Sequence, residues 1–505
     1  MIRIKVKTLA IGSVAIILLL IAAYSLLPSL LMRMEKYDIL LANFPGSKEA
    51  PEALYWAAET TVPNPEEEGR IFIFHESVSY SNGSQNSREQ LNDAQGLLER
   101  LIDGYPDYRH IDMARSKLAQ IYLANGELDQ AEPLFREIET TAKDEYRRNE
   151  AKTFADLLAS RRSADNGVPS LTGSVRIGDS PAADTYVVLR RKSDNGWYSK
   201  PYGHYPMAMT DRNGEYRFYD ISPDEYEVGV GVTAAEVDGY FLTDQDGAAV
   251  TISAASTASY DIRFVPKVNI VSPTNKEEMR GSDADKIRFA WEPYPGASGY
   301  KLSITALERD KDGKVRGTFT VTTDELWREP NAEYDVRTLR TYPRGTGKSG
   351  TKDEVWLSTS GILGTVYPGG DFIWSVDAYD KDGKRISSSS GYYLSFNSQV
   401  PFFSVDDAFQ LEGDKLVLQG DYEGAIKAYE GEPNNPYALR ALALLWMNGF
   451  TSFEDRGDKA KALTYLLKIP NPVKFDYELM QLIYEELGNK AEADKIREKL
   501  EGLGE

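Results

Sequence analysis

Two short acidic stretches carry oxygen ligands at the close spacing that a cation site requires. The first is DRNGE at 211–215, and the second is DKDGK, which occurs at 310–314 and again at 380–384. An EF-hand needs a bidentate carboxylate at its twelfth position, but Phe319 and Ser389 occupy that position in the two DKDGK copies. Asp-Gly and Asn-Gly are also common in turns between strands. We therefore predict strand-joining turns rather than metal sites.

An aromatic cluster in the Gly- and Pro-containing stretch 196–207 is a second candidate for ligand contact. Its members combine a flat apolar face with a polar tip, which suits stacking on sugar rings or on a partner protein; they are Trp197, Tyr198, Tyr202, His204 and Tyr205. The alternative is that these rings cover the edge of a β-sandwich, because aromatic side chains usually bury their area.

A basic stretch interrupts an otherwise acidic chain. Within residues 337–352, cations stand at Arg337, Arg340, Arg344, Lys348 and Lys352. Such a group could contact an anionic wall polymer or phospholipid headgroups. The alternative is a flexible, solvated loop, because the segment is rich in glycine.

The composition excludes several classes of function. The 505 residues include 78 acidic and 58 basic side chains, a net charge of −20, which argues against nucleic-acid binding by phosphate neutralisation. The chain has no cysteine, three histidines and no His-Glu-x-x-His sequence. We therefore predict a non-catalytic protein without a cofactor or a metal ion.

The N-terminus resembles a membrane anchor. Residues 1–7 are basic, and residues 8–32 contain no charge over a length that can cross a bilayer as a helix. The basic flank predicts a cytoplasmic tail at 1–7, a single membrane pass at 8–32 and an extracytoplasmic bulk. The alternative is a signal peptide cleaved near Ser25, after which the protein is secreted.

Helical periodicity dominates residues 33–163 and 401–505. The first region resembles the tetratricopeptide repeat at Ala119, Tyr122, Gly126, Ala131 and Phe135. The second shows the same pattern at Gly420, Tyr422, Ala425 and Tyr429. This resemblance implies stacked helical hairpins whose concave surface holds a partner protein.

Alternating periodicity dominates the middle of the chain. Residues 169–265 resemble the carboxypeptidase regulatory-like domain, related to transthyretin, in LTGSVRIGDSPAADTYVVLRR, MTDRNGEYRFYDISPDEYEVGVGV and SYDIRFV. That resemblance implies an accessory β-sandwich without catalytic residues. Residues 266–400 resemble a fibronectin type III-like domain in IRFAWEPYPGASGYKLSI and DFIWSVDAYDKDGK, with Trp291 and Trp374 as the predicted core aromatics.

The predicted fold is therefore multidomain. It has all-α tetratricopeptide-like repeats at both ends, two all-β immunoglobulin-like or transthyretin-like sandwiches in the middle, and one N-terminal transmembrane helix that contacts the lipid bilayer. The predicted function is a membrane-anchored extracytoplasmic scaffold that binds unidentified partner proteins through helical grooves and β-sandwich modules. The alternative is a cell-surface protein that binds cell-wall glycan through the aromatic loop 196–207. No nucleic-acid partner is expected.

Overall fold

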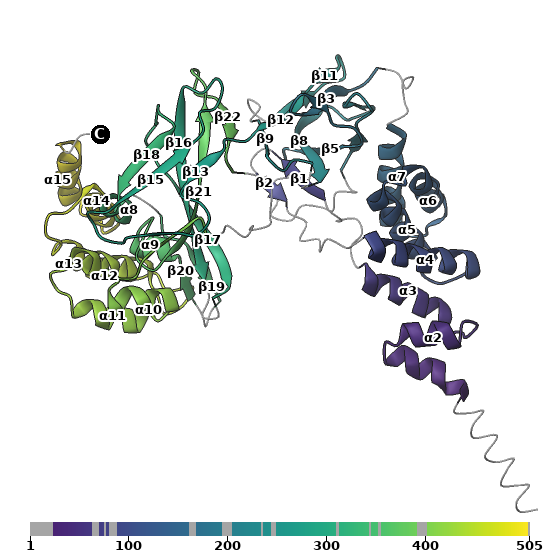
Figure 1. Ribbon diagram of the computed structural model, residues 1–505, viewed down its shortest axis with the longest axis horizontal. Helices are drawn as coiled ribbons and strands as arrows, with labels where there is room; N and C mark the ends of the chain where they lie inside the picture. Colours follow the sequence, from purple (N-terminus) through teal and green to yellow (C-terminus); the bar gives the residue numbers. More distant parts are fainter. Residues whose placement is uncertain are drawn as a thin grey trace, which may run out of the picture. The chain divides into compact units, whose positions relative to one another are not determined.

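The computed structural model divides into two compact units, Met1–Phe264 and Val265–Glu505. Helices lie toward both ends of the chain and strands lie between them (Figure 1). The structure describes residues 24–62, 70–74, 77–79, 88–160, 168–193, 205–233, 236–243, 249–309, 313–342, 345–351, 355–390 and 401–502.

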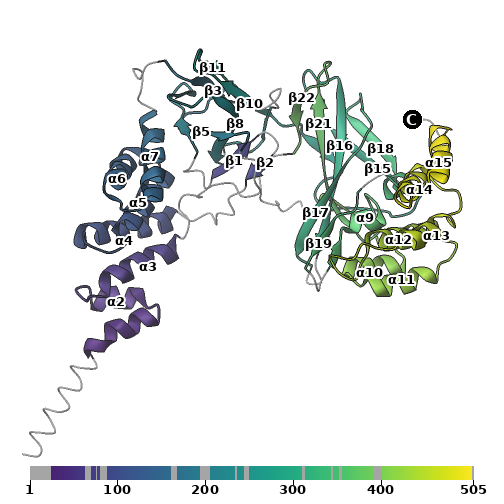
Figure 2. The ribbon, with the colours of Figure 1, turned by 180° about the vertical axis from the view of Figure 1, so that it is seen from behind.

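The first unit begins with an array of antiparallel helices. They are α2 (Tyr37–Asn43), α3 (Ala50–Thr61), α4 (Arg88–Gly104), α5 (Ile111–Asn125), α6 (Leu128–Thr141) and α7 (Glu145–Ser160). Consecutive helices pack side by side (Figures 1 and 2). Between α5 and α6, Gly126 has a φ of +76°, a conformation that favours glycine and allows the tight turn. Ala119 and Ala131 are fully buried, and their small side chains allow α5 and α6 to approach closely.

Two β-sheets follow in the first unit. Their strands are β1 (Arg70–Phe74), β2 (Ser77–Ser79), β3 (Leu171–Ile177), β4 (Ser180–Pro181), β5 (Tyr186–Arg191), β6 (Met207–Met209), β7 (Glu215–Phe218), β8 (Asp224–Thr233), β9 (Tyr240–Leu242), β10 (Ala249–Ile252), β11 (Ala258–Ser259) and β12 (Ile262–Pro266). One sheet has the order β2-β1-β8-β5-β6, with β10 also paired to β8. The other has the order β11-β3-β12-β9, with β4 and β7 paired to β3.

Strands β1 and β2 come from residues 33–163, the region that we predicted to form helical repeats. Ile73 of β1 lies opposite Val230 of β8 in an antiparallel register, and its side chain is 1% exposed. The insertion between α3 and α4 therefore completes a sheet whose other strands lie more than a hundred residues later in the chain. This pairing ties the helices to the β region.

The helices and the first sheet also share one hydrophobic core. Phe135 and Phe154 of α6 and α7 belong to the same buried cluster as Met207 and Met209 of β6. At the end of α7, the Ser160 hydroxyl oxygen accepts a hydrogen bond of 3.0 Å from the backbone N–H of Met209. The first unit is thus a helical array fixed to a sheet.

The second unit contains a β-sandwich. Its elements are β13 (Ile270–Ser272), β14 (Glu277–Met279), β15 (Lys286–Trp291), β16 (Gly299–Arg309), β17 (Val315–Thr322), β18 (Asn331–Asp335), α8 (Val336–Arg340), β19 (Lys348–Gly350), β20 (Val355–Leu357), α9 (Thr359–Leu363), β21 (Asp371–Tyr379), β22 (Arg385–Ser388) and β23 (Phe403–Val405). One sheet has three strands in the order β13-β15-β18. The other has the order β14-β23-β21-β16-β17, with β22 also paired to β21. The two sheets face each other through aromatic contacts. Phe289 of β15 lies 5.1 Å from Trp374 of β21, measured between ring centroids. Trp291 and Trp374 are each 3% exposed, so the prediction that they are core residues is confirmed.

Six helices complete the second unit: α10 (Glu412–Gln419), α11 (Tyr422–Glu430), α12 (Pro436–Asn448), α13 (Lys459–Leu466), α14 (Lys474–Glu486) and α15 (Lys490–Gly502). Their apolar faces belong to the same core cluster as the sandwich. Within this core, Arg440 of α12 donates hydrogen bonds of 2.6 and 2.8 Å to the two carboxylate oxygens of Asp476 on α14. A buried charge pair therefore links two of the helices.

The predicted transmembrane helix over 8–32 is corrected by the structure, and so is the predicted localisation as a single-pass membrane protein with an extracytoplasmic bulk. None of the helices in the described residues is both long enough and apolar enough to span a bilayer. Residues 8–23 of the predicted span lie outside the described residues. Residues 24–33 form a helix of roughly 15 Å, about half of a bilayer core.

The described end of that segment packs against the helical array instead of continuing. The ring of Tyr24 lies 5.0 Å from the ring of Phe44, and the Ser29 hydroxyl donates a hydrogen bond to the Glu49 carboxylate. Glu35 has a φ of 55°, which ends the helical conformation and turns the chain toward α2.

Candidate partner-binding site

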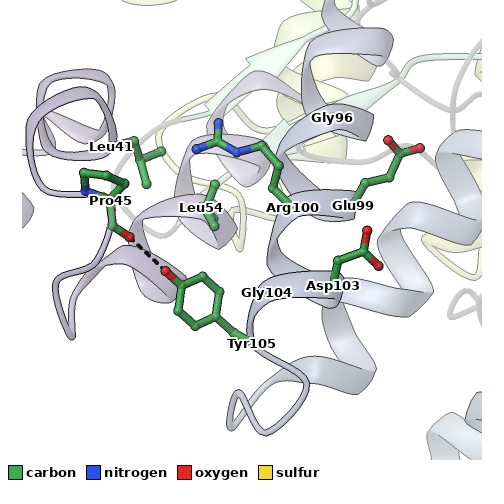
Figure 3. Close-up of a pocket in the computed structure, with 9 residues that line it drawn as sticks. All are labelled: Leu41, Pro45, Leu54, Gly96, Glu99, Arg100, Asp103, Gly104 and Tyr105. Carbon is green, nitrogen blue, oxygen red and sulfur yellow. Dashed lines mark hydrogen bonds between the residues drawn. The ribbon is translucent and has the colours of Figure 1, made fainter.

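Two hollows meet at α4 in the helical array, and we call them together the α4 groove. The first has a volume of about 560 Å³ and is lined by Leu41, Pro45, Leu54, Gly96, Glu99, Arg100, Asp103, Gly104 and Tyr105 (Figure 3). The second has a volume of about 440 Å³ and is lined by Glu99, Ile102, Asp103, Leu118, Tyr122, Gln130, Pro133 and Leu134. Glu99 and Asp103 line both hollows, so the two adjoin along one side of α4.

Hydrogen bonds fix the walls of the α4 groove. The Tyr105 hydroxyl donates to the carbonyl oxygen of Pro45 at 2.9 Å, which joins the end of α4 to the loop before α3 (Figure 3). The Tyr122 hydroxyl donates to Glu99 Oε1, also at 2.9 Å. Burial and the neighbouring Glu99 carboxylate both raise the pKa of Tyr122, so the phenol stays protonated and continues to donate.

Not all the charged side chains of the groove have a partner in the described part of the chain. Glu99 and Asp103 are four residues apart, so they lie on one face of α4, whereas Arg100 points to the other side (Figure 3). Asp103 and Arg100 form no hydrogen bond or ion pair with any residue in the described part of the chain. Among the described residues, Glu99 accepts only from the uncharged donors Tyr122 and Gln95. The groove therefore combines leucine and proline side chains, with Arg100 beside those of the first hollow, and two carboxylates that form no ion pair with a described cation.

A second surface exposes Trp56 and Arg109, which are held in place by Glu52 and by the buried rings of Tyr55 and Tyr108. We call it the Trp56 surface. The side chain of Trp56 is 41% exposed, yet its indole N–H donates to Glu52 Oε1 at 3.0 Å. The same carboxylate accepts from Arg109 Nη2 at 2.8 Å and from the Tyr108 hydroxyl at 3.1 Å. Tyr55 packs edge-on against the indole at 5.6 Å.

These three donors keep Glu52 ionised. Burial acts to raise the pKa of Glu52, but the hydrogen bonds from Arg109, Trp56 and Tyr108 outweigh it and hold the pKa below its usual value. Glu52 and Trp56 lie one helical turn apart on α3, and Pro106 ends α4 so that the following loop delivers Tyr108 and Arg109 to them.

The α4 groove and the Trp56 surface lie on different faces of α3. Leu54 lines the groove, and Trp56 follows two residues later, roughly 200° further around the helix axis. The sequence predicted partner binding through helical grooves but indicated no residue of either site. The pair Glu52 and Trp56 was a usable signal, but their partners Tyr108 and Arg109 lie more than fifty residues away in the chain.

The aromatic loop predicted as a ligand contact lies mostly outside the described residues, which exclude Trp197, Tyr198, Tyr202 and His204. Tyr205 is described and is only 5% exposed, within the core that the helices share with β6. Its ring is therefore not available for stacking on a sugar. Glycan binding by this loop stays a prediction.

The described members of the predicted basic stretch are dispersed, and Arg344 and Lys352 lie outside the described residues. Arg337 is exposed on α8, but Arg340 is 5% exposed, with its guanidinium 3.6 Å from the centre of the Tyr437 ring. Arg340 also lies 3.8 Å from carboxylate oxygens of Asp283 and Asp414. It therefore links α8 to the C-terminal helices rather than facing an external anion.

Lys348 is also engaged inside the second unit. Its ammonium donates to the carbonyl oxygen of Asn448, the last residue of α12, at 3.0 Å and to that of Asp455, in the loop after α12, at 2.5 Å. The Asp455 carboxylate organises this loop by accepting from the backbone N–H groups of Phe450, Thr451 and Gly457 and from the Thr451 hydroxyl. Burial acts to raise the pKa of Asp455, but these hydrogen bonds lower it to about 2.

We expect the loop after α12 to lose its order when the pH falls from about 4 to 2. Because the pKa of Asp455 is lower in the folded state than in the unfolded state, its stabilising effect is complete above the unfolded value of about 4 and is lost as the pH falls through about 2. Hydrogen-exchange protection of the Phe450, Thr451 and Gly457 amides should fall several-fold over that range. In Asp455→Asn the protection should be low already at pH 5, whereas the exposed neighbour Glu454→Gln should behave as wild type. Unchanged protection in Asp455→Asn would contradict this role.

The acidic stretches at 211–215 and 380–384 form the predicted turns. Asp211 Oδ1 accepts from the backbone N–H groups of Asn213 at 2.9 Å and Glu215 at 3.0 Å. In the copy at 380–384, Asp380 Oδ1 accepts from Asp382 and Lys384 at the same two distances. The copy at 310–314 begins outside the described residues. Elsewhere too, the described ranges contain no group of three His, Cys, Asp or Glu side chains placed to hold a metal ion.

Comparison with known proteins identifies no family, and the similarity to a solved structure is distant. No family model matches the chain, and no curated protein matches its sequence. Among solved structures, the chain is similar to the crystal structure of the chicken CNTN1 FN1-FN3 domains, with 11% sequence identity and a TM-score of 0.12. The match covers 43% of this chain and 60% of that chain, so this chain spans less than two thirds of that structure. The β-sandwich of the second unit is defined by its own strand pairing.

Proposed function

We propose that this protein is a non-catalytic scaffold that binds a partner protein on helices α2 to α7. The observation that carries the proposal is the Trp56 surface. Tryptophan, tyrosine and arginine are the residues most enriched at the energetic centres of protein interfaces, and all three meet at Glu52. Because the hydrogen bond to Glu52 already fixes the indole, the Trp56 side chain loses little conformational entropy when a partner binds.

The arrangement of the helices also supports a scaffold. We interpret α3 to α7 as tetratricopeptide-like hairpins, since Gly126 provides the turn and Ala119, Ala131 and Phe135 are fully buried. The β regions are then accessory modules, carboxypeptidase regulatory-like in the first unit and fibronectin type III-like in the second. The strand β1 and the contact between Ser160 and Met209 hold the helices firmly to the first of them.

We expect Trp56→Ala to weaken partner binding about 30-fold or more, because truncation of an interface tryptophan typically costs at least 2 kcal/mol. A photo-crosslinking residue placed at the exposed position 107 of the full chain, beside the Trp56 surface but not part of it, and expressed in its own cells, should trap one defined protein. Trp56→Ala should abolish that crosslinked species. Glu52→Gln should reduce it by a smaller factor, since the indole remains but loses an ionised acceptor.

The matched control is Phe453→Ala, which removes an aromatic side chain of similar exposure, 47%, from the second unit. It should leave the crosslinked species unchanged. Thermal unfolding of each variant separates loss of binding from loss of fold. A crosslinked species that persists in a folded Trp56→Ala variant would contradict the proposed function.

A further inference from the structure

We infer that the α4 groove binds an extended segment of a partner protein, and that a lysine or arginine of this segment places its cation between Glu99 and Asp103. This site is separate from the Trp56 surface, because Leu54 and Trp56 point to different sides of α3. The inference therefore holds whether or not Trp56 contacts a partner.

The shape of the groove favours an extended chain. The two hollows, of about 560 and 440 Å³, adjoin at Glu99 and Asp103 and together reach from α2 across α4 to α6. Their walls are apolar at intervals, with Leu41, Pro45 and Leu54 in the first hollow and Leu118, Pro133 and Leu134 in the second. Alternate side chains of an extended segment can enter neighbouring hollows of this kind.

The charge at the centre selects the side chain. Two carboxylates one helical turn apart repel each other, and a cation between them relieves that repulsion. Lysine and arginine also have long apolar stems, which can pack on the leucine and proline walls while the charged end reaches the carboxylates. The chain as a whole carries −20, so its long-range field attracts a basic segment as well.

The protein leaves this position open to an incoming cation. Asp103 has no hydrogen-bond or ion-pair partner among the described residues, and Glu99 is held by the neutral groups of Tyr122 and Gln95. Arg100, the nearest cation in sequence, lines the first hollow on the side of Leu41 and Leu54 and points away from both carboxylates (Figure 3). The hydrogen bond from Tyr122 fixes Glu99 without neutralising it, so the site is charged and oriented before a segment binds.

The test uses the full chain and fluorescein-labelled nine-residue peptides with identical leucine- and serine-containing flanks. Their central residue is arginine, lysine, the neutral arginine analogue citrulline, or glutamate. We expect fluorescence anisotropy to show at least tenfold tighter binding of the arginine and lysine peptides than of the citrulline peptide. The double variant Glu99→Gln, Asp103→Asn should bind the arginine peptide no better than wild type binds the citrulline peptide.

Two further variants make the result specific. Asp93→Asn removes an exposed carboxylate on the same helix outside the groove and should leave the preference intact. Asp103→Lys should reverse the preference toward the glutamate peptide. Equal binding of the arginine and citrulline peptides, no binding of any peptide, or an unchanged preference in the double variant would overturn the inference. None of these outcomes bears on the crosslinking test of Trp56, so the two proposals fail separately.

Discussion

Replacing Asp476 with asparagine is expected to lower the free energy of unfolding of the second unit by about 3–5 kcal/mol. Asp476 is fully buried, and its two oxygens accept hydrogen bonds of 2.6 and 2.8 Å from Arg440, which is 4% exposed. Asparagine cannot neutralise the guanidinium, so the variant leaves a buried, uncompensated charge. Asp476 Oδ2 also accepts from the backbone N–H of Val473 at 2.9 Å, and the start of α14 should loosen as well.

Urea unfolding followed by tryptophan fluorescence can measure this loss, because most of the chain's seven tryptophans lie in the second unit: Trp291, Trp327, Trp356, Trp374 and Trp446. The matched control is Glu486→Gln, which breaks the ion pair with Lys459 at a site where both side chains are more than a third exposed. That variant should lose less than about 1 kcal/mol.

The double variant Arg440→Met, Asp476→Leu tests the physical reason for the loss. Removing both charges leaves no uncompensated charge in the core, and the remaining loss is the acceptor of the Val473 N–H, so stability should return to within about 1–2 kcal/mol of the wild type. A double variant as unstable as Asp476→Asn would show that packing, and not an uncompensated charge, causes the effect. An Asp476→Asn variant that loses less than about 1 kcal/mol would contradict the prediction outright.

The pair also shows what the sequence could not provide. Arg440 stands within PYALRALALLWMN, where the apolar pattern predicts a buried helix face but gives no reason for a charge in it. Its partner lies 36 positions later on another helix. Periodicity predicts which face of a helix is buried, but the pairing of two buried charges depends on how α12 and α14 pack, which no local pattern encodes.

The same limit applies to the candidate sites. Local patterns were sufficient for the helices around Gly126, for the core positions of Trp291 and Trp374, and for the turn at Asp211, because each depends on residues within a few positions. The Trp56 surface depends on a loop brought back from beyond α4. Aromatic composition alone indicated the stretch 196–207, where Tyr205 is in fact buried, since composition does not distinguish a ring in a core from one at a surface.

Strand β1 and the N-terminal segment are the two larger misjudgements, and both concern tertiary packing. RIFIF is rich in the β-branched and aromatic residues typical of a strand, but a five-residue run between helices is weak evidence until β8 supplies the partner edge. The apolar stretch 8–32 has the composition of a membrane span. Its described end nevertheless turns at Glu35 and packs on Phe44 and Glu49, which depends on helices that the stretch itself does not specify.

Gly214→Ala is expected to destabilise the first unit by about 3 kcal/mol, whereas Gly383→Ala should cost the second unit only about 1 kcal/mol. The two glycines occupy the same position in equivalent turns, with φ angles of +75° and +79°. Placing an alanine in the left-handed region therefore costs a similar backbone free energy at both positions. Only their surroundings differ.

A Cβ atom at Gly214 would lie 2.6 Å from the carbonyl oxygen of Val175 and 3.1 Å from Pro181 Cβ, whereas at Gly383 it would meet nothing within 4 Å. The β3 backbone cannot move aside without disturbing its pairing with β7, so overlap adds to the backbone cost only in the first unit. Hydrogen exchange read by mass spectrometry reports each unit separately in the intact chain. Equal losses of protection in the two variants would show that φ alone determines the cost and that the approach of β3 to the turn is not rigid.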